Sequence, residues 1–293
     1  MIDLWFLIIA FLWTGYFILE GFDFGVGMLA PIVSRGPDQR RQALQTIGPV
    51  WDGNEVWLIT AVGVMFAAFP AWYAGMFSGF YLPVVLVLVG LIVRGVGLEW
   101  RGKVERTFWC DAGIVAGSAV PAFMWGAVFA HMLHGTLASA VVGGVFSLAV
   151  CLLHGAVFLA LRTGGPVRDR ARRAALAISV LAIPTAILAL SQIPSTLPAL
   201  AATAAIAAAT ALIWRRREGW AFTATAAGIA LASAAVFTTL RAEPLTGLTL
   251  AEAASGPYTL TVLSWIGLFT LPFVLLYQGW TYWVFRKRVL VPA

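Results

Sequence analysis

Four carboxylates stand in two short segments of a sequence that otherwise keeps its charges away from its long apolar runs. Glu20 and Asp23 form one pair, and Asp52 and Glu55 form the other. The members of each pair are three residues apart, so on a helix both side chains of a pair lie on one face. Ionisable groups at membrane depth are costly, and those that occur there commonly carry protons or bind ions. The pattern favours proton transfer as the chemistry of these segments.

The same acids also have a purely structural interpretation. Negative charge in the first turn of a helix is stabilising, and Asp52 follows Pro49 closely enough to act in this way. Arg94, at the cytoplasmic end of a predicted helix over 78–97, is the one basic residue expected near the acids. In this interpretation the acids cap helices and pair with Arg94. Four acids facing one arginine would leave one or two of them neutral or sharing a proton at pH 7, which favours proton transfer.

The composition is typical of an integral membrane protein. Of 293 residues, 61% are hydrophobic and 11% are charged, and the mean hydropathy is +0.89. Charged residues divide the chain into apolar blocks, and a helix needs about 20 apolar residues to cross a bilayer. The blocks predict one all-α transmembrane domain over 1–293 that crosses the membrane nine times. The predicted helices cover 4–28, 48–69, 78–97, 112–133, 139–161, 174–193, 198–214, 220–239 and 258–285.

Three segments outside the helix interiors carry expectations of their own. Residues 70–75 are predicted to form a short aromatic turn, with Trp72 and Tyr73 at the level of the lipid headgroups. Residues 162–173 are predicted to form a strongly basic loop. The apolar run from Leu4 has no positive region before it and continues into a long helix, so we expect it to be retained as a membrane span and not cleaved as a signal peptide.

The distribution of Lys and Arg tests the helix count and predicts the orientation. All 19 of these residues except Arg241 fall on one side of the nine-helix arrangement. Positive charge concentrates on the cytoplasmic side of membrane proteins, so the N-terminus is expected outside and the C-terminus in the cytoplasm. The net charge of +6 then favours the headgroups of the lipid bilayer, and not nucleic acid, as the partner of the basic residues.

Helix geometry places the acids towards the cytoplasmic side. Glu20 follows Leu4 by 16 residues, which corresponds to about 24 Å of helix in an apolar core about 30 Å thick. The second predicted helix begins on the cytoplasmic side and carries Asp52 and Glu55 in its first turns. The first two helices are therefore expected to bring all four acids together.

Three histidines are the only other candidates for ligand chemistry. His131 and His134 are three residues apart near the outer end of the fourth predicted helix, and His154 is in the fifth. No third ligand of matching depth is evident, and a haem needs a pocket of its own. We expect hydrogen-bonded or interfacial histidines, with neither a metal ligand nor a haem ligand among them.

Glycines beside the first pair of acids predict close helix packing. Gly21 and Gly25 form a small-xxx-small step, which lets two helices approach closely in lipid. A phosphate-binding loop would need a preceding strand, and the sequence predicts none.

The acids lie in two motifs, GFDFGVGM at 21–28 and WDGNEVWLIT at 51–60. Further motifs are FAAFP at 66–70, RGVGLEWR at 94–101, PYTL at 257–260 and YQGWTYW at 277–283. Together these motifs resemble subunit II of the cytochrome bd quinol oxidases, and the block Asp52-Gly53-Asn54 is highly specific for that family. The resemblance covers most of the chain, although the alanine-rich part over 174–217 matches only in hydropathy.

The resemblance implies a fold and a complex. The fold would be two four-helix bundles plus one additional helix, paired with a similarly folded subunit I. Subunit I would hold two haems b and one haem d, oxidise quinol and reduce dioxygen to water in aerobic respiration, while this chain would hold no haem. Some members of the family bind a quinone in subunit II, and small single-helix accessory subunits are further partners. The implied location is the bacterial cytoplasmic membrane.

The resemblance also implies roles for the acids. Glu20 and Asp52 match positions on a proton path from the cytoplasm, with Asp23, Glu55 and Arg94 as supporting ionisable residues. Two alternatives stay open. A proton-coupled secondary transporter would also use buried acids, but at a midplane site formed by broken helices, whereas these acids lie near the cytoplasmic end. A purely structural subunit would keep its acids ion-paired and inert.

Overall fold

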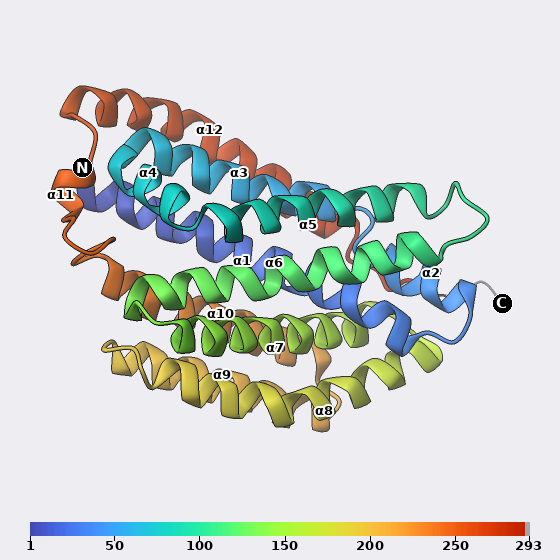
Figure 1. Ribbon diagram of the computed structural model, residues 1–293. Helices are drawn as coiled ribbons and strands as arrows, with labels where there is room; N and C mark the ends of the chain where they lie inside the picture. Colours follow the sequence, from blue (N-terminus) through green and yellow to red (C-terminus); the bar gives the residue numbers. More distant parts are fainter. Residues whose placement is uncertain (291–293) are drawn as a thin grey trace.

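Twelve helices make up the computed structural model, which describes residues 1–290 (Figure 1). The described residues form no strand, only two isolated β-bridges in connecting segments, so the predicted all-α class is confirmed. The helices are α1 (Ile2–Val33), α2 (Pro37–Gln45), α3 (Trp51–Ala68), α4 (Pro70–Gly79), α5 (Tyr81–Trp100), α6 (Phe108–His134), α7 (Leu137–Arg162), α8 (Gly165–Leu190), α9 (Thr196–Trp214), α10 (Glu218–Leu240), α11 (Leu250–Ala253) and α12 (Pro257–Val284).

Eight of these helices are long and apolar enough to cross a membrane, namely α1, α5, α6, α7, α8, α9, α10 and α12. They lie side by side along one direction (Figure 1). The second predicted span corresponds to α3, which has 18 residues and begins with Asp52, Asn54 and Glu55 in its first turns. Those polar residues lower the mean hydropathy of α3 and set it apart from the other eight.

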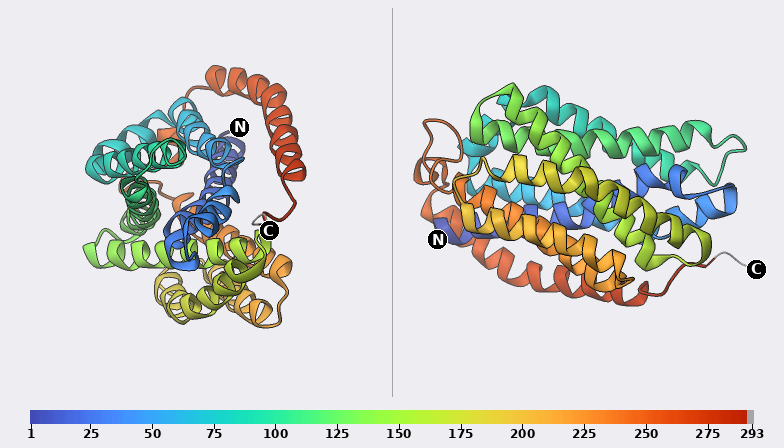
Figure 2. Two further views of the ribbon diagram at one scale, coloured as in Figure 1. Left: turned by 90° about the vertical axis from the view of Figure 1, so that its right-hand side faces the viewer. Right: turned by 90° about the horizontal axis from the view of Figure 1, so that it is seen from below.

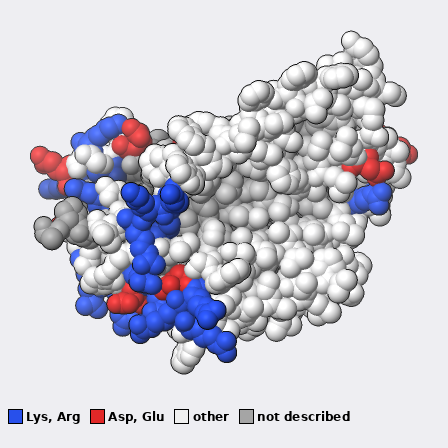
Figure 3. Space-filling view, turned by 180° about the vertical axis from the view of Figure 1, so that it is seen from behind, with Lys and Arg blue, Asp and Glu red and all other residues white. Residues whose placement is uncertain are grey.

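Charged side chains gather at the two ends of the helices and leave a broad uncharged belt between them (Figure 3). Most of the basic side chains lie at one end. At the end where the N-terminus lies, Arg241 forms an ion pair of 2.8 Å with Asp3. Large apolar side chains such as Ile92 and Phe273 are exposed on the outside of the helices, as expected for a surface that faces lipid.

The first helix forms the centre of the packing. α1 packs against α3, α6, α7 and α10, and all residues from Glu20 to Ala30 are buried. A helix that is apolar on all sides lies in a protein core or in lipid, and in this second half of α1 the surroundings are other helices. The two acids of α1 are therefore positioned by the core of the protein.

Close contact between α1 and α7 depends on two glycines. A Cβ atom built on Gly25 would lie 2.7 Å from the Cα atom of Gly155, whereas one built on Gly21 meets only ordinary contacts, the nearest at 3.7 Å. The predicted close approach is confirmed at Gly25, and its counterpart on α7 is Gly155.

α12 lies along the outer edge of the molecule (Figure 2). Only Leu260 is buried among its 28 residues. Near its beginning, the Trp5 indole N–H donates to the Leu260 carbonyl and to Ser264 Oγ, each over 3.2 Å. After its end, the Val289 N–H donates to the Arg162 carbonyl over 2.8 Å. These contacts hold both ends of α12 and leave most of its apolar surface open.

The predicted aromatic turn over 70–75 is wrong, because this segment is part of α4. Pro70 occupies the first turn of α4, where its fixed φ favours a helix and no N–H is needed. Trp72 is 1% exposed and stacks on Phe6 with ring centroids 5.9 Å apart, so it packs inside the protein and not among the headgroups. Tyr73 is half-buried and stacks on Phe77.

The predicted basic loop over 162–173 is also wrong. α7 ends at Arg162 and α8 begins at Gly165, so most of this basic segment forms the first turns of α8. Gly165 has a φ of +60° and Pro166 follows it, which allows an abrupt start to the helix. Charge marks where the chain leaves the membrane, but a helix can continue beyond that point.

Candidate functional site

Three side chains from three helices form a buried ion-paired cluster. Arg94 of α5 contacts Glu20 of α1 through both guanidinium NH2 groups, with Nη1–Oε2 at 2.7 Å and Nη2–Oε1 at 3.0 Å. Arg94 Nη2 also contacts Glu55 Oε1 of α3 at 2.8 Å. The Arg94–Glu20 pair is bidentate, which is the preferred geometry of arginine and carboxylate. Since two carboxylates share one guanidinium, the cluster can bind one proton and become electrically neutral.

The position of Arg94 follows from its neighbours. Its guanidinium lies 4.8 Å from the centre of the Phe24 ring, a favourable arrangement for a cation on an aromatic face. A Cβ atom built on Gly117 would lie 2.7 Å from the Arg94 backbone nitrogen. The absence of a side chain at Gly117 therefore lets α6 pack directly against the turn of α5 that carries Arg94.

Asp23 belongs to a different hydrogen-bond network from Glu20. Asn54 Nδ2 of α3 donates to Asp23 Oδ2 over 2.6 Å. Asn54 Oδ1 accepts hydrogen bonds from the Tyr282 hydroxyl at 2.7 Å and from Gln278 Nε2 at 3.1 Å. Asp23 and Asn54 are fully buried, and Asp23 Oδ1 has no hydrogen-bond partner among the described residues. This network joins α1, α3 and α12.

The structure brings together Glu20, Asp23 and Glu55, but Asp52 lies apart from them. Asp52 is exposed in the first turn of α3, whereas the Glu55 side chain is 23% exposed and Glu20 is fully buried. The expectation that all four acids meet is therefore wrong for Asp52. Because α3 begins only at Trp51, the side chain of Asp52 is at the surface, and Glu55, one turn further along, is the first acid that reaches Arg94.

An aromatic layer lies on the other side of Glu20. Tyr16, one turn before Glu20 on α1, is fully buried, and its hydroxyl accepts a hydrogen bond from Trp125 Nε1 over 3.1 Å. Trp13 packs edge to face on Trp125 and on Phe129, with ring centroids 4.8 Å and 5.3 Å away. This dense packing separates the acids from the half of the molecule where the N-terminus lies.

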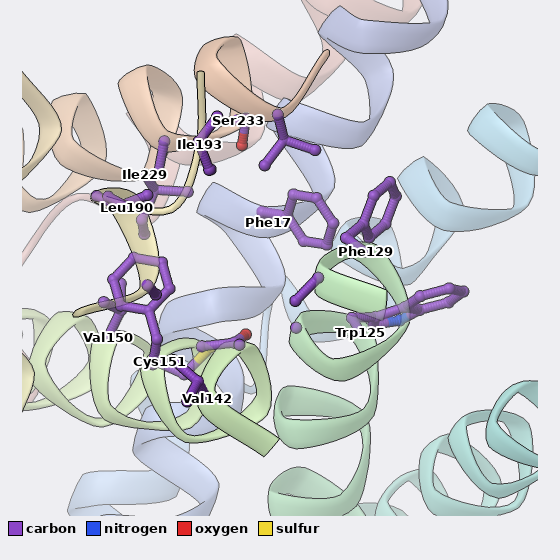
Figure 4. Close-up of a pocket in the computed structure, with 18 of the residues that line it drawn as sticks. Phe17, Trp125, Phe129, Val142, Val150, Cys151, Leu190, Ile193, Ile229 and Ser233 are labelled. Atoms are coloured by element: carbon purple, nitrogen blue, oxygen red, sulfur yellow. The ribbon is translucent and has the colours of Figure 1, made fainter. Parts of the chain in front are cut away.

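An apolar cavity of about 130 Å³ lies beside this layer, among α1, α6, α7, α10 and the segment that joins α8 to α9 (Figure 4). Phe17, Phe129, Cys151 and Ile229 are among its lining residues. No Asp, Glu, Lys or Arg lines it. The cavity is suited to an apolar molecule and is chemically separate from the acids.

Two of the histidines are engaged in hydrogen bonds, as predicted. His154 is fully buried, with Nδ1 2.6 Å from Thr225 Oγ1 and Nε2 3.2 Å from the Ile18 carbonyl oxygen. His131 Nδ1 lies 3.1 Å from the Thr136 carbonyl oxygen. Both ring nitrogens of His154 thus have protein partners.

Sequence reasoning missed the roles of Asn54, Gln278 and Tyr282 within this site. Gln278 and Tyr282 are polar side chains in a largely apolar helix, and Asn54 stands between two acids; that was the available signal. Residues 54 and 278 are 224 positions apart, so no local pattern could show that they meet. Their convergence depends on how α12 packs beside α3.

Known proteins resemble this chain over nearly its whole length. The sequence model of the family "Cytochrome bd terminal oxidase subunit II" matches residues 1–285. Cytochrome bd ubiquinol oxidase subunit 2 of Bacillus subtilis is 39% identical, with 98% of this chain and 96% of that protein covered. Cytochrome bd-I ubiquinol oxidase subunit 2 of Escherichia coli is 30% identical, with 98% and 94% covered.

A solved structure has the same fold. A chain of the bd oxidase from Geobacillus thermodenitrificans superimposes with a TM-score of 0.79 at 18% sequence identity, and the match covers 98% of this chain and 99% of that chain. The sequence match over nearly the whole chain and the shared fold lead to one assignment. The chain belongs to the cytochrome bd terminal oxidase subunit II family.

Proposed function

We propose that this chain supports a haem-bearing subunit I in a quinol:oxygen oxidoreductase and supplies that complex with protons from the cytoplasm. Subunit I would carry haem b and haem d, oxidise quinol and reduce dioxygen to water. The observation that carries the proposal is the buried Arg94, which forms ion pairs with both Glu20 and Glu55. Asp52, one helical turn before Glu55 on α3, is exposed at the surface. Acids buried at membrane depth are expensive to keep, and a role in proton transfer accounts for them.

The proposed path has three steps, and burial increases along it. Asp52 at the surface collects a proton and passes it one helical turn to the partly exposed Glu55. Glu55 passes it to the fully buried Glu20, the other carboxylate that contacts Arg94, while Arg94 itself stays protonated. The aromatic layer of Trp13, Tyr16 and Trp125 blocks continuation along α1. The proton would therefore leave sideways towards the partner subunit, where dioxygen chemistry consumes it.

We propose nine crossings, with α3 as the ninth in addition to the eight apolar helices. α3 lies beside α1 with α12 on its outer side, and its polar beginning matches the basic, headgroup-facing end of the molecule. In the arrangement of two four-helix bundles and one further helix, α12 is the further helix because it is the least buried. The protein would sit in the bacterial inner membrane with its N-terminus outside and its basic end in the cytoplasm.

The test is purification of the chain from its native membrane in mild detergent, followed by a reduced-minus-oxidised visible spectrum and quinol-driven oxygen uptake. Co-purification of a haem protein with b-type and d-type bands, together with oxygen uptake, would support the proposal. A colourless, solitary chain would overturn it and would direct attention to proton-coupled transport by the same acids.

A further inference from the structure

The side-chain amide of Asn54 forms hydrogen bonds through both its nitrogen and its oxygen. Its nitrogen donates to Asp23 Oδ2, while its oxygen accepts from Tyr282 and Gln278. Asn54 is fully buried, so water does not replace a lost partner at low cost. Two donors on Oδ1 favour the orientation that turns the N–H group towards Asp23.

Gln278 and Tyr282 are unusual among the polar residues of α12. Thr261, Thr270 and Thr281 each donate to a carbonyl one turn earlier in the same helix. Gln278 and Tyr282 instead reach across to Asn54 of α3. They are four residues apart, which places both side chains on one face of α12. The contact is therefore a specific polar connection between a peripheral helix and the buried site.

The protonation of Asp23 depends on the few charged and hydrogen-bonding groups around it. Glu20 of α1, Glu55 of α3 and Arg94 of α5 are the charged groups that act on Asp23. On the side of α12, Tyr282 also faces Arg162 of α7. Asp23 Oδ1 is buried without a hydrogen-bond partner. The N–H of Asn54 is thus the one hydrogen-bond donor to Asp23 among the described residues.

We infer that Gln278 and Tyr282 are positioning residues of the acidic site, which act through Asn54 to hold Asp23 as a proton acceptor. An amide N–H favours the ionised form of the carboxylate it contacts. If the two donors on Asn54 Oδ1 are lost, the amide can turn over and present its oxygen to Asp23. That arrangement requires a proton on Asp23. The inference extends the proposed function to α12, but the network itself can be tested without oxygen uptake.

The experiment is infrared titration of the complete purified complex. The carboxylic-acid band of Asp23 is assigned by its loss in Asp23→Asn. In Tyr282→Phe, which keeps the shape of the ring, we expect this band to persist to a pH up to about one unit higher, because loss of one of the two donors on Asn54 Oδ1 weakens the preference for the orientation that donates to Asp23 by about one neutral hydrogen bond. Gln278→Leu, which removes the other donor without adding a charge, should move the band in the same direction.

The matched control is Tyr277→Phe, the same chemical change on the same helix at a side chain that is 64% exposed. It should leave the titration unchanged. Asn54→Leu tests the route: if Tyr282 acts through Asn54, then Tyr282→Phe adds no further shift in that background. Should Asn54→Leu fail to assemble, Tyr282→Phe combined with Gln278→Leu answers the question: both donors act on one atom, so the combined shift should differ from the sum of the single shifts, and an exact sum would contradict action through Asn54.

Three results would overturn the inference. They are the absence of any Asp23 band that titrates, a Tyr282→Phe titration equal to that of the wild type, and a shift that adds in full to that of Asn54→Leu. A complex that titrates as expected but takes up no oxygen would instead contradict the proposed function and leave the positioning role intact.

Discussion

At the scale of single residues, the decisive feature is that one guanidinium serves two carboxylates. Arg94 and Glu20 are fully buried, while the Glu55 side chain is 23% exposed. Buried ion pairs add little stability by themselves, but removal of one partner leaves an uncompensated charge. Arg94 therefore holds the site together, and the acids provide its capacity for protons.

Substitution of Arg94 should reveal this role. In Arg94→Gln two carboxylates lose their counter-charge, and we expect the unfolding free energy to fall by about 3–5 kcal/mol. Arg94→Lys keeps the charge without the bidentate geometry and should lose less. Thermal denaturation in detergent measures both. Equal stability of Arg94→Gln and the wild type would contradict the proposed pairing.

Asp52 is the acid whose function can be separated from folding, because it is exposed and makes no ion pair among the described residues. Asp52→Asn should slow quinol-driven oxygen uptake about tenfold or more, as expected for loss of a proton-transfer group, with unchanged haem content. Asp38→Asn, an exposed acid in α2, is the control. Loss of the haems in Asp52→Asn would favour the purely structural role.

At the scale of helices, the closest helix–helix contacts occur at glycines, which have no side chain. Gly155 of α7 lies directly against α1, since a Cβ atom built there would be 2.6 Å from the Val26 backbone nitrogen. This crossing fixes the height of α1 and with it the depth of Glu20 and Asp23. The site therefore depends on a contact that involves none of its own residues.

Gly155→Ala should separate α1 from α7 and cost about 1–3 kcal/mol or more, as overpacking does. Gly63→Ala is the matched control in α3, where a Cβ atom meets nothing within 4 Å. There the change should be neutral or slightly stabilising. A thermal melt of the two variants tests this, and equal effects at both positions would contradict the crossing.

The lengths of the apolar blocks and the positions of the charges predicted most of the long helices, but not their ends. The apolar blocks correspond to α1, α3, α5, α6, α7, α8, α9, α10 and α12. The prediction failed where helices extend past the membrane, as in the basic beginning of α8, or where proline starts a helix, as in α4. Contacts between distant helices, such as Asn54 with Gln278, depend on tertiary packing that no local pattern encodes.

At the scale of the whole molecule, the charged ends and the apolar belt define how the protein sits in a bilayer. Most of the Lys and Arg in the view of Figure 3 lie at one end of the helices. Arg40 and Arg41 of α2 directly precede α3 in the chain, so the acids at the beginning of α3 lie towards the basic side. The proposed path thus takes its protons from one side of the membrane only. In the proposed path, that side is the cytoplasm.

Cysteine labelling can test the orientation in whole cells. In a Cys110→Ser background, an impermeant maleimide should label Glu243→Cys, which follows α10 at the N-terminal end. Lys103→Cys, in the exposed α5–α6 connection, should react only after the membrane is permeabilised. The reverse pattern would invert the topology and remove the cytoplasmic source of protons.

The proposed proton path is tested by measuring from which side of the membrane the complex consumes protons. The complete complex is reconstituted into lipid vesicles with its basic end facing the medium, quinol is added, and the pH of the medium and the oxygen concentration are recorded together. The account predicts that the medium becomes alkaline in step with oxygen uptake, and that Asp52→Asn slows both rates equally. Unchanged rates in Asp52→Asn, or proton consumption from the vesicle interior, would contradict it.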